Sequence, residues 1–216
     1  ITLGFAGFVR EGSNALVQIV CNATLRIYGG DIYVGIMTIL NSVRDMTTLP
    51  INGLSSGSQP VLGFNFGARK PERVRKGILF TTIAGMIYGT ALWAIVILFP
   101  HPFLAMFTKD PAILTAGRHA IRVYYAAFFM MIFQFSGQST FIALGDSKYA
   151  IFFSIFRKVI IVVPLTILLP LLAGLGTDGV FLAEPVSNGI GGLTCYLTMI
   201  RVVWKKQLST DAPLKE

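Results

Sequence analysis

Carboxylate and amide side chains recur at helical spacing inside hydrophobic stretches of this sequence. The first stretch carries them at i, i+3, i+7 and i+11, which is one face of a helix: Glu11, Asn14, Gln18 and Asn22. An ionisable group inside a membrane-spanning helix costs at least about 2.5 to 3.5 kcal/mol, so its presence requires a reason. A buried carboxylate must be paired, protonated or hydrated, and each of these states is useful to a cation carrier.

Polar faces recur in three further hydrophobic stretches. The second stretch contains Asn41, Arg44, Asp45, Thr48, Asn52, Ser55 or Ser56, and Gln59; the fourth contains Gln134 and Gln138; the sixth contains Glu184, Asn188, Cys195 and Thr198. We expect these faces to point into a helix bundle and to line an aqueous path. The candidate substrate- and ion-binding residues are Glu11, Asn14, Gln18, Asn41, Arg44, Asp45, Gln134, Gln138 and Glu184.

Structural roles remain open for the same residues. Uncharged polar side chains in membrane helices often only hydrogen-bond to neighbouring helices, and Arg10 or Arg44 can pair with an adjacent or facing carboxylate. Glu11 lies only a turn or two into its helix, where it can be hydrated near the membrane interface. The pair Arg157-Lys158 is interpreted as structural, because long basic side chains near a helix end snorkel to the headgroups.

The composition is that of an integral membrane protein. Hydrophobic residues make up 54% of the chain and charged residues only 13%, whereas about a quarter of the residues in a soluble domain are charged. At about 20 apolar residues per span, a chain of 216 residues has room for about six crossings. The predicted fold class is an all-α, membrane-embedded bundle of six helices.

The predicted spans are separated by turn-forming residues. They cover about 5–28, 32–66, 77–99, 123–144, 149–172 and 180–204, and a polar cytoplasmic tail follows at 205–216. Gly29-Gly30 separates the first two spans. The second span is longer than a bilayer core and contains Pro50 and Pro60, so it should be kinked or project from the membrane. Residues 101–122 are of mixed character and are expected to lie along the interface.

Basic residues lie mainly between the hydrophobic stretches. Membrane topology therefore explains the net charge of +8 better than a nucleic-acid partner does. One set of alternate connections carries Arg69, Lys70, Arg73, Arg75, Lys76, Lys148, Lys205 and Lys206, and the other carries Arg26, Lys109, Arg118 and Arg122. The positive-inside rule then places both ends of this segment in the cytoplasm of a multi-pass protein of the cell membrane. Because the chain opens at Ile1 without methionine, we expect it to be part of something longer.

Signals of an enzyme are weak. The sequence contains no HExxH, GxSxG or Walker-type motif. Gly189-Ile190-Gly191-Gly192 lies inside a hydrophobic helix, which favours close helix packing over phosphate binding. Cys21 and Cys195 are isolated, without the spacing of a metal site or a disulfide framework. We predict no catalytic residue, no cofactor and no metal beyond transient sodium.

Residues 57–68 read GSQPVLGFNFGA and resemble the GxQPxxGxNxGA signature of the MATE family of multidrug and toxic compound exporters. The motif positions include Gln59, Pro60, Gly63, Asn65, Gly67 and Ala68. Further agreement comes from ALGDSK at 143–148, from Arg157 followed by Pro164-Leu165 and Pro170, and from AEPVS at 183–187. The resemblance covers nearly the whole chain and is closest to the MepA-like branch.

This resemblance implies the second lobe, helices seven to twelve, of a twelve-helix transporter built from two six-helix lobes. It implies export of an organic cation or drug by alternating access, driven by inward sodium or proton flow. The missing amino-terminal lobe, or a second copy, would supply the opposite cavity wall. Some branches hold a coupling glutamate in the first helix of this lobe, for which Glu11 is the nearest equivalent although Asn14 is an alternative by spacing. The fourth helix lacks the aspartate that those branches use there.

Two other functions are compatible with the same features. A flippase for lipid-linked saccharides shares this helix arrangement in related exporters. A broad hydrated cavity with several cationic residues would favour it, whereas the small number of arginines inside the predicted spans argues against it. A non-transporting membrane scaffold or half-subunit is the alternative outside transport. Cation flux through the isolated segment would separate transport from scaffolding, because one lobe should lack half of the cavity wall.

Overall fold

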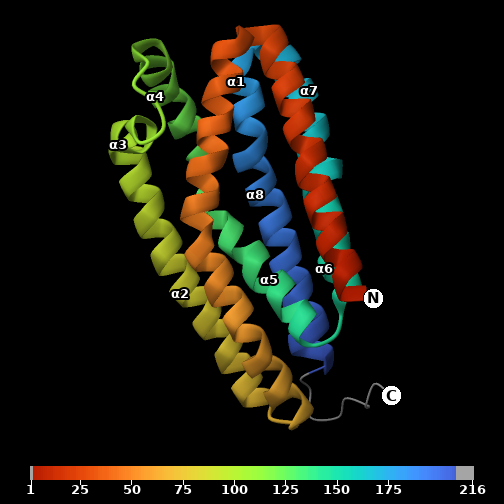
Figure 1. Cartoon of the computed structure of the whole chain (residues 1–216). Helices are drawn as coiled ribbons and strands as arrows, with labels where there is room; N and C mark the ends of the chain where they lie inside the picture. The colour runs from red at the N-terminus through yellow and green to blue at the C-terminus, as the bar shows by residue number, and fades with distance from the viewer. Residues whose placement is uncertain (1, 208–216) are drawn as a thin grey trace.

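Two long helical arms joined at Gly30 open the chain. The structure, a computed structural model, describes residues 2–207, and it describes side chains at 12–172 and 174–203. Helix α1 spans Thr2–Gly67, and its helical dihedral angles are interrupted at Gly30, where φ is 70° and ψ is −168°. Glycine is the residue that adopts a positive φ without a steric penalty. Figure 1 shows the chain reversing there, so we call residues 2–29 the first arm and 31–67 the second arm.

The second arm is too long for one bilayer core. At about 1.5 Å per residue, residues 31–67 extend for roughly 55 Å, against about 30 Å of hydrocarbon. The arm remains α-helical through Pro50 and Pro60. Its length therefore exceeds the thickness of one bilayer core, and the non-helical break in α1 is at Gly30, not at either proline.

The rest of the chain is also helical, and residues 2–207 contain no strand. The elements after α1 are α2 (Pro71–Leu98), α3 (Pro100–Ala105), α4 (Pro111–Tyr125), η1 (Phe128–Met130), α5 (Met131–Ala143), α6 (Ser147–Ile155), η2 (Phe156–Val162), α7 (Val163–Leu171), η3 (Leu172–Gly174), α8 (Thr177–Met199) and η4 (Ile200–Gln207). Several of these follow one another without a loop, so the fold is a bundle of six long helices.

Helix α4 differs from the sequence expectation. Residues 111–122, expected in an interfacial connection, form a helix whose Gly117, Ala120 and Ile121 are buried in the bundle. The local sequence explains this start: Asp110 caps the helix by accepting a hydrogen bond from the Ala112 amide at 2.9 Å, and Pro111 occupies the first turn. The fourth long helix therefore starts before the predicted span at 123.

Three of the described helical stretches are long and apolar enough to cross a membrane: Pro71–Leu98, Pro111–Ala143 and Ser147–Leu171. The two arms of α1 and helix α8 are more polar, because they carry the stripes described above. α8 packs against α5 and α7, and α1 packs against α2 and α5. The polar helices are thus held against the apolar ones.

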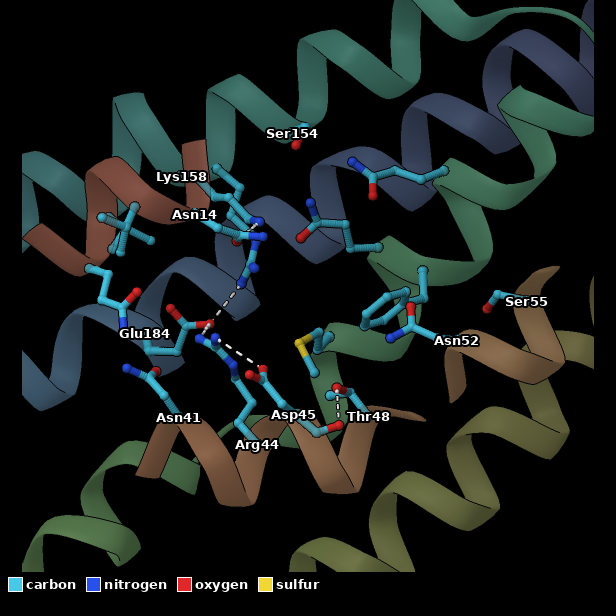
Figure 2. Close-up of a pocket in the computed structure, with 18 of the residues that line it drawn as sticks. Asn14, Asn41, Arg44, Asp45, Thr48, Asn52, Ser55, Ser154, Lys158 and Glu184 are labelled. Carbon is cyan, nitrogen blue, oxygen red and sulfur yellow. Dashed lines mark hydrogen bonds and ion pairs between the residues drawn. The ribbon is translucent and has the colours of Figure 1, made fainter. Parts of the chain in front are cut away.

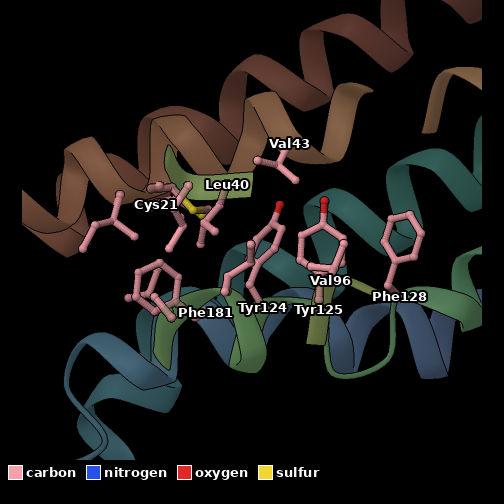
Figure 3. Close-up of a cluster of buried hydrophobic side chains, with 14 of the residues drawn as sticks. Cys21, Leu40, Val43, Val96, Tyr124, Tyr125, Phe128 and Phe181 are labelled. Atoms are coloured by element: carbon pink, nitrogen blue, oxygen red, sulfur yellow. The ribbon is translucent and has the colours of Figure 1, made fainter. Parts of the chain in front are cut away.

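An aromatic cluster fixes the arms of α1 to α4 and α8. Tyr124 and Tyr125 are buried between them, and Tyr125 stacks on Phe128 with ring centroids 4.9 Å apart. Cys21 and Leu40, one from each arm, belong to the same buried cluster (Figure 3). Cys21 is therefore a packing residue, with its Sγ 3.7 Å from the Thr166 hydroxyl.

Candidate functional site

A polar cavity of about 520 Å³ lies between the two arms of α1 and helices α5, η2 and α8. Amide and hydroxyl side chains make up much of its wall. The polar and charged lining residues are Asn14, Gln18, Asn41, Arg44, Asp45, Thr48, Asn52, Ser55, Ser56, Gln59, Tyr124, Gln134, Gln138, Ser139, Ser154, Arg157, Lys158 and Glu184. Such a wall can hydrate or bind a polar solute inside a hydrophobic bundle.

The centre of the cavity wall is a row of alternating charges. Arg44 places Nη2 3.4 Å from Asp45 Oδ1 and Nη1 3.9 Å from Glu184 Oε1. On the other side, Arg157 Nη1 donates to Glu184 Oε1 at 3.1 Å and also to the Asn188 side-chain oxygen. Figure 2 shows Arg44 and Asp45 from the second arm of α1 beside Glu184 of α8. One carboxylate, that of Glu184, therefore joins α1, η2 and α8.

The two ends of this row differ in exposure. The side chains of Arg157 and Glu184 are only 8% and 9% exposed, whereas that of Asp45 is 73% exposed. Each charge of a buried ion pair requires its partner, because an unpaired charge in a low-dielectric interior has a large desolvation penalty. Asp45 is therefore the carboxylate available to a solute, while Glu184 is occupied by two guanidinium groups.

Arg44 is positioned by aromatic hydroxyl groups. Its Nη1 donates to the Tyr124 hydroxyl at 2.9 Å, and that hydroxyl donates to Asn41 Oδ1 at 3.2 Å. The neighbouring Tyr125 hydroxyl lies 3.1 Å from Thr47 Oγ1. The guanidinium is thus fixed from α4 as well as by the carboxylates.

A π-helical segment brings two basic residues to the cavity. Element η2 winds with a wider turn than an α-helix, a feature that is frequent at functional sites, and the consecutive residues Arg157 and Lys158 both line the cavity. Lys158 Nζ donates to the Asn14 side-chain oxygen of the first arm (Figure 2). Space for Arg157 comes from Gly191, where a Cβ would lie 2.7 Å from Arg157 Cγ.

Two buried polar atoms of the cavity wall have no hydrogen-bond partner among the described residues: Arg157 Nε and Gln134 Oε1. Gln134 is 5% exposed and Arg157 is 7% exposed. An unmet donor and an unmet acceptor in a buried position are unfavourable. Water or a bound solute in the cavity would satisfy them.

The structure brings together eight of the nine candidate site residues. Asn14, Gln18, Asn41, Arg44, Asp45, Gln134, Gln138 and Glu184 all line the cavity. The side chain of Glu11 lies outside the described residues. No group of three or more His, Cys, Asp and Glu side chains that could hold a metal ion occurs among the residues described.

The snorkelling expected of Arg157 is wrong, whereas the structural role expected of it is in keeping with its buried ion pair. Arg157 does not snorkel to the headgroups, since its side chain is buried and paired with Glu184. Lys158 lines the cavity beside it. The signal was present in the sequence, because the pair lies more than two helical turns beyond Ser147, too deep to count as a helix end.

The GSQPVLGFNFGA motif forms the end of the second arm and the turn that follows. Gln59 lines the cavity, and Gly63 packs so closely on α5 that a Cβ would lie 3.0 Å from the Ala143 carbonyl oxygen. Asn65 Nδ2 donates to the Val61 carbonyl at 2.8 Å. Gly67 is the last helical residue, and the Ala68 amide donates to the Phe64 carbonyl at 2.9 Å. The motif thus combines helix packing, a helix end and one cavity residue.

Comparison with known proteins identifies the family. The MatE family model matches residues 13–168, which is well over half of the chain. The chain belongs to the MatE family. Membership places this MatE chain among membrane transport proteins rather than enzymes, and its apolar helices make it a multi-pass membrane protein.

Similar proteins support the same fold. The FAD transporter of Shewanella oneidensis is 24% identical over 160 residues, which cover 74% of the MatE chain and 35% of that protein. A multidrug resistance MATE family transporter in an inward-facing conformation superimposes with a TM-score of 0.89 at 18% identity, covering 97% of this chain and 48% of the other. A MOP superfamily transporter from Pyrococcus furiosus gives a TM-score of 0.88 at 20% identity, with 95% and 46% covered.

The MatE chain therefore spans 35% of the curated relative and 46% to 48% of these two solved structures. Its helices match one half of the MATE transporter fold. The cavity described above lies within that half.

Proposed function

We propose that the chain forms one half of a transporter that moves an organic solute across a membrane by alternating access. The observation that carries this proposal is the polar cavity, with its charged row, inside a hydrophobic helix bundle of the MatE family. A bundle needed only for anchoring has no use for so many polar groups, since each carries a cost in the membrane. The missing lobe, or a second copy of the chain, would complete the cavity wall.

The first candidate solute is an organic cation or drug, exported in exchange for sodium or protons. Asp45 supports it, because its exposed carboxylate can attract a cation. Met131, Phe135 and Tyr124 in the cavity wall add the adaptable and aromatic contacts that organic cations favour. Similarity to multidrug MATE transporters is in keeping with this class. The coupling ion would bind at Asp45, Glu184 or Glu11. Both ends of the segment would lie on the cytoplasmic side of the plasma membrane.

A second candidate solute is an organic anion that carries phosphate. Three cationic side chains line the cavity, Arg44, Arg157 and Lys158, against the two carboxylates of Asp45 and Glu184. Guanidinium and ammonium groups are the usual phosphate ligands of proteins. The relative from Shewanella oneidensis transports FAD, which carries two phosphate groups. A flippase acting on a lipid-linked saccharide phosphate belongs to the same chemical class.

Flux measurements separate these candidates. The full-length protein would be reconstituted in proteoliposomes, and transport of ethidium and of FAD would be followed under an imposed sodium or proton gradient. Ethidium transport lost in Asp45→Asn supports the cation class, and FAD transport lost in Lys158→Gln supports the anion class. Flux of neither probe, together with no binding to the cavity, would leave the scaffold or half-subunit function.

A further inference from the structure

A second, apolar groove lies between the second arm of α1 and helix α2, apart from the polar cavity. Its volume is about 320 Å³, and its lining residues are Gly53, Leu54, Gly57, Ser58, Val61, Leu62, Gly77, Phe80 and Thr81. None of the lining residues is charged. The groove does not share a residue with the wall of the polar cavity.

Small residues create this groove. A Cβ added at Gly53 or Gly57 would meet nothing within 4 Å, so the missing side chains leave open space. The two hydroxyl groups of the wall are turned to their own helices: Ser58 Oγ donates to the Ser55 carbonyl at 2.7 Å, and Thr81 Oγ1 donates to the Gly77 carbonyl at 2.9 Å. The wall of the groove is therefore apolar despite these two hydroxyl groups.

Large apolar side chains border the groove and remain exposed. Phe80 is 68% exposed and Val61 is 58% exposed. In a multi-pass membrane protein, exposed apolar surface of this kind faces lipid chains or another protein. The chemistry at the end of the groove decides between these two.

That end is strongly basic. The turn between α1 and α2 and the first turns of α2 contain Arg69, Lys70, Arg73, Arg75 and Lys76, directly before the groove residue Gly77. Arg73 and Lys76 are exposed and, at about 1.5 Å per residue, begin within roughly 6 Å of Gly77 along the helix axis. The acidic residue in this run, Glu72, pairs with Arg75 at 3.1 Å. The end of the apolar groove at Gly77 therefore lies beside an excess of positive charge.

We propose that this groove binds an anionic phospholipid, with an acyl chain between α1 and α2 and the headgroup phosphate at Arg73 and Lys76. Basic clusters directly beside membrane helices attract anionic lipids, by about 1 kcal/mol for each Lys or Arg near the surface. An apolar helix of a protein partner would fill the apolar part but would leave the basic end without a counter-charge. This inference rests on the membrane fold and not on the transported solute.

Lipid retention tests the proposal directly. The full-length protein would be reconstituted in vesicles of equal phosphatidylglycerol and phosphatidylcholine, extracted in mild detergent, and analysed by mass spectrometry for bound lipid. We expect the protein to retain phosphatidylglycerol preferentially. Arg73→Gln with Lys76→Gln should reduce that preference about fivefold for each charge removed. Lys109→Gln with Arg118→Gln, exposed basic residues on α4 and the loop before it, is the matched control and should change nothing.

A second experiment fills the groove with a larger side chain. Gly57→Leu should abolish retention of both lipids at this site, whereas Gly57→Ala and Ala91→Leu, an exposed position of α2 outside the groove, should not. Glycerol phosphate, which has the headgroup charge without an acyl chain, should not displace the lipid. Equal retention of the two lipids, or no effect of Gly57→Leu in correctly folded protein, would overturn the proposal. Loss of a protein partner instead of lipid in Gly57→Leu would assign the groove to that partner.

Discussion

Glu184 holds the centre of the cavity wall because one buried carboxylate serves two arginines. Arg157 donates to it at 3.1 Å and Arg44 lies 3.9 Å from it. Removing the charge of one partner in a buried pair usually destabilises more than the pair itself contributes, because the other partner stays buried and charged. Glu184 thus connects α8 to α1 and η2 and fixes the orientation of both arginines.

Glu184→Gln should lower the free energy of unfolding by about 3 to 5 kcal/mol, because it leaves Arg157 buried without a counter-charge. Asp45→Asn is the matched control: its side chain is 73% exposed, so we expect a change of about 0 to 1 kcal/mol. Thermal unfolding of both variants in the same lipid or detergent measures the difference. Equal stability of the two would contradict the central role of Glu184.

Glu11→Gln tests the coupling role that the family resemblance implies. We expect the variant in the full-length protein to reduce dye or drug export without loss of folding, because a neutral amide cannot exchange a proton or bind sodium as a carboxylate does. Export would be followed in proteoliposomes under a sodium or proton gradient. Unchanged export would remove Glu11 from the mechanism.

At the scale of the elements, close helix contacts bring the site residues together. Gly192 of α8 lets that helix approach η1 and the start of α5, since a Cβ there would lie 2.6 Å from the carbonyl oxygen of Met130, the last residue of η1. The Gly189 to Gly192 run therefore does serve packing, as its position in a hydrophobic helix predicts. The same face of α8 carries Glu184 and Asn188 toward η2.

Gly192→Ala should force α5 and α8 apart, because the obstacle is backbone and cannot rotate away. Overpacking of this kind costs about 1 to 3 kcal/mol. Gly189→Ala is the control in the same helix, where the nearest neighbour of the new Cβ is the flexible Met130 side chain at 3.5 Å. Comparison of the two unfolding temperatures checks the prediction, and a smaller loss for Gly192→Ala than for Gly189→Ala would refute it.

Part of the cavity wall and of the helix pattern could be predicted from the sequence. The spacing of Asn41, Asp45 and Glu184 identified three cavity residues, because a polar residue in a membrane helix has few places to point. The same reasoning took Arg157 for a snorkelling residue although it lies more than two turns beyond Ser147. Pattern alone could not reveal the π-helical turn at 156–162 or the space left by Gly191. Helix α4 was missed for a related reason: Asp110 and Pro111 start a helix that hydropathy alone did not predict.

At the scale of the whole molecule, the described fold matches one half of the MATE transporter fold and holds a polar cavity and a separate apolar groove. The start of α1, the end of α8 and the turn between α1 and α2 lie toward the lower end of the bundle in Figure 1, while the bend at Gly30 lies at the upper end. If the cavity is a transport path, its residues must become reachable from each side of the membrane in turn. The residues of the apolar groove need not become reachable from either side.

Cysteine accessibility tests that claim most directly. In the full-length protein with Cys21 and Cys195 replaced by serine, Asn52→Cys in the cavity wall would be labelled with a membrane-impermeant maleimide from each side of sealed vesicles. Ile87→Cys, 68% exposed on the apolar surface of α2, is the control and should react from neither side. We predict that reversing the ion gradient shifts the reactive side of Asn52→Cys. Labelling from one side only, whatever the gradient and solute, would contradict alternating access through this cavity.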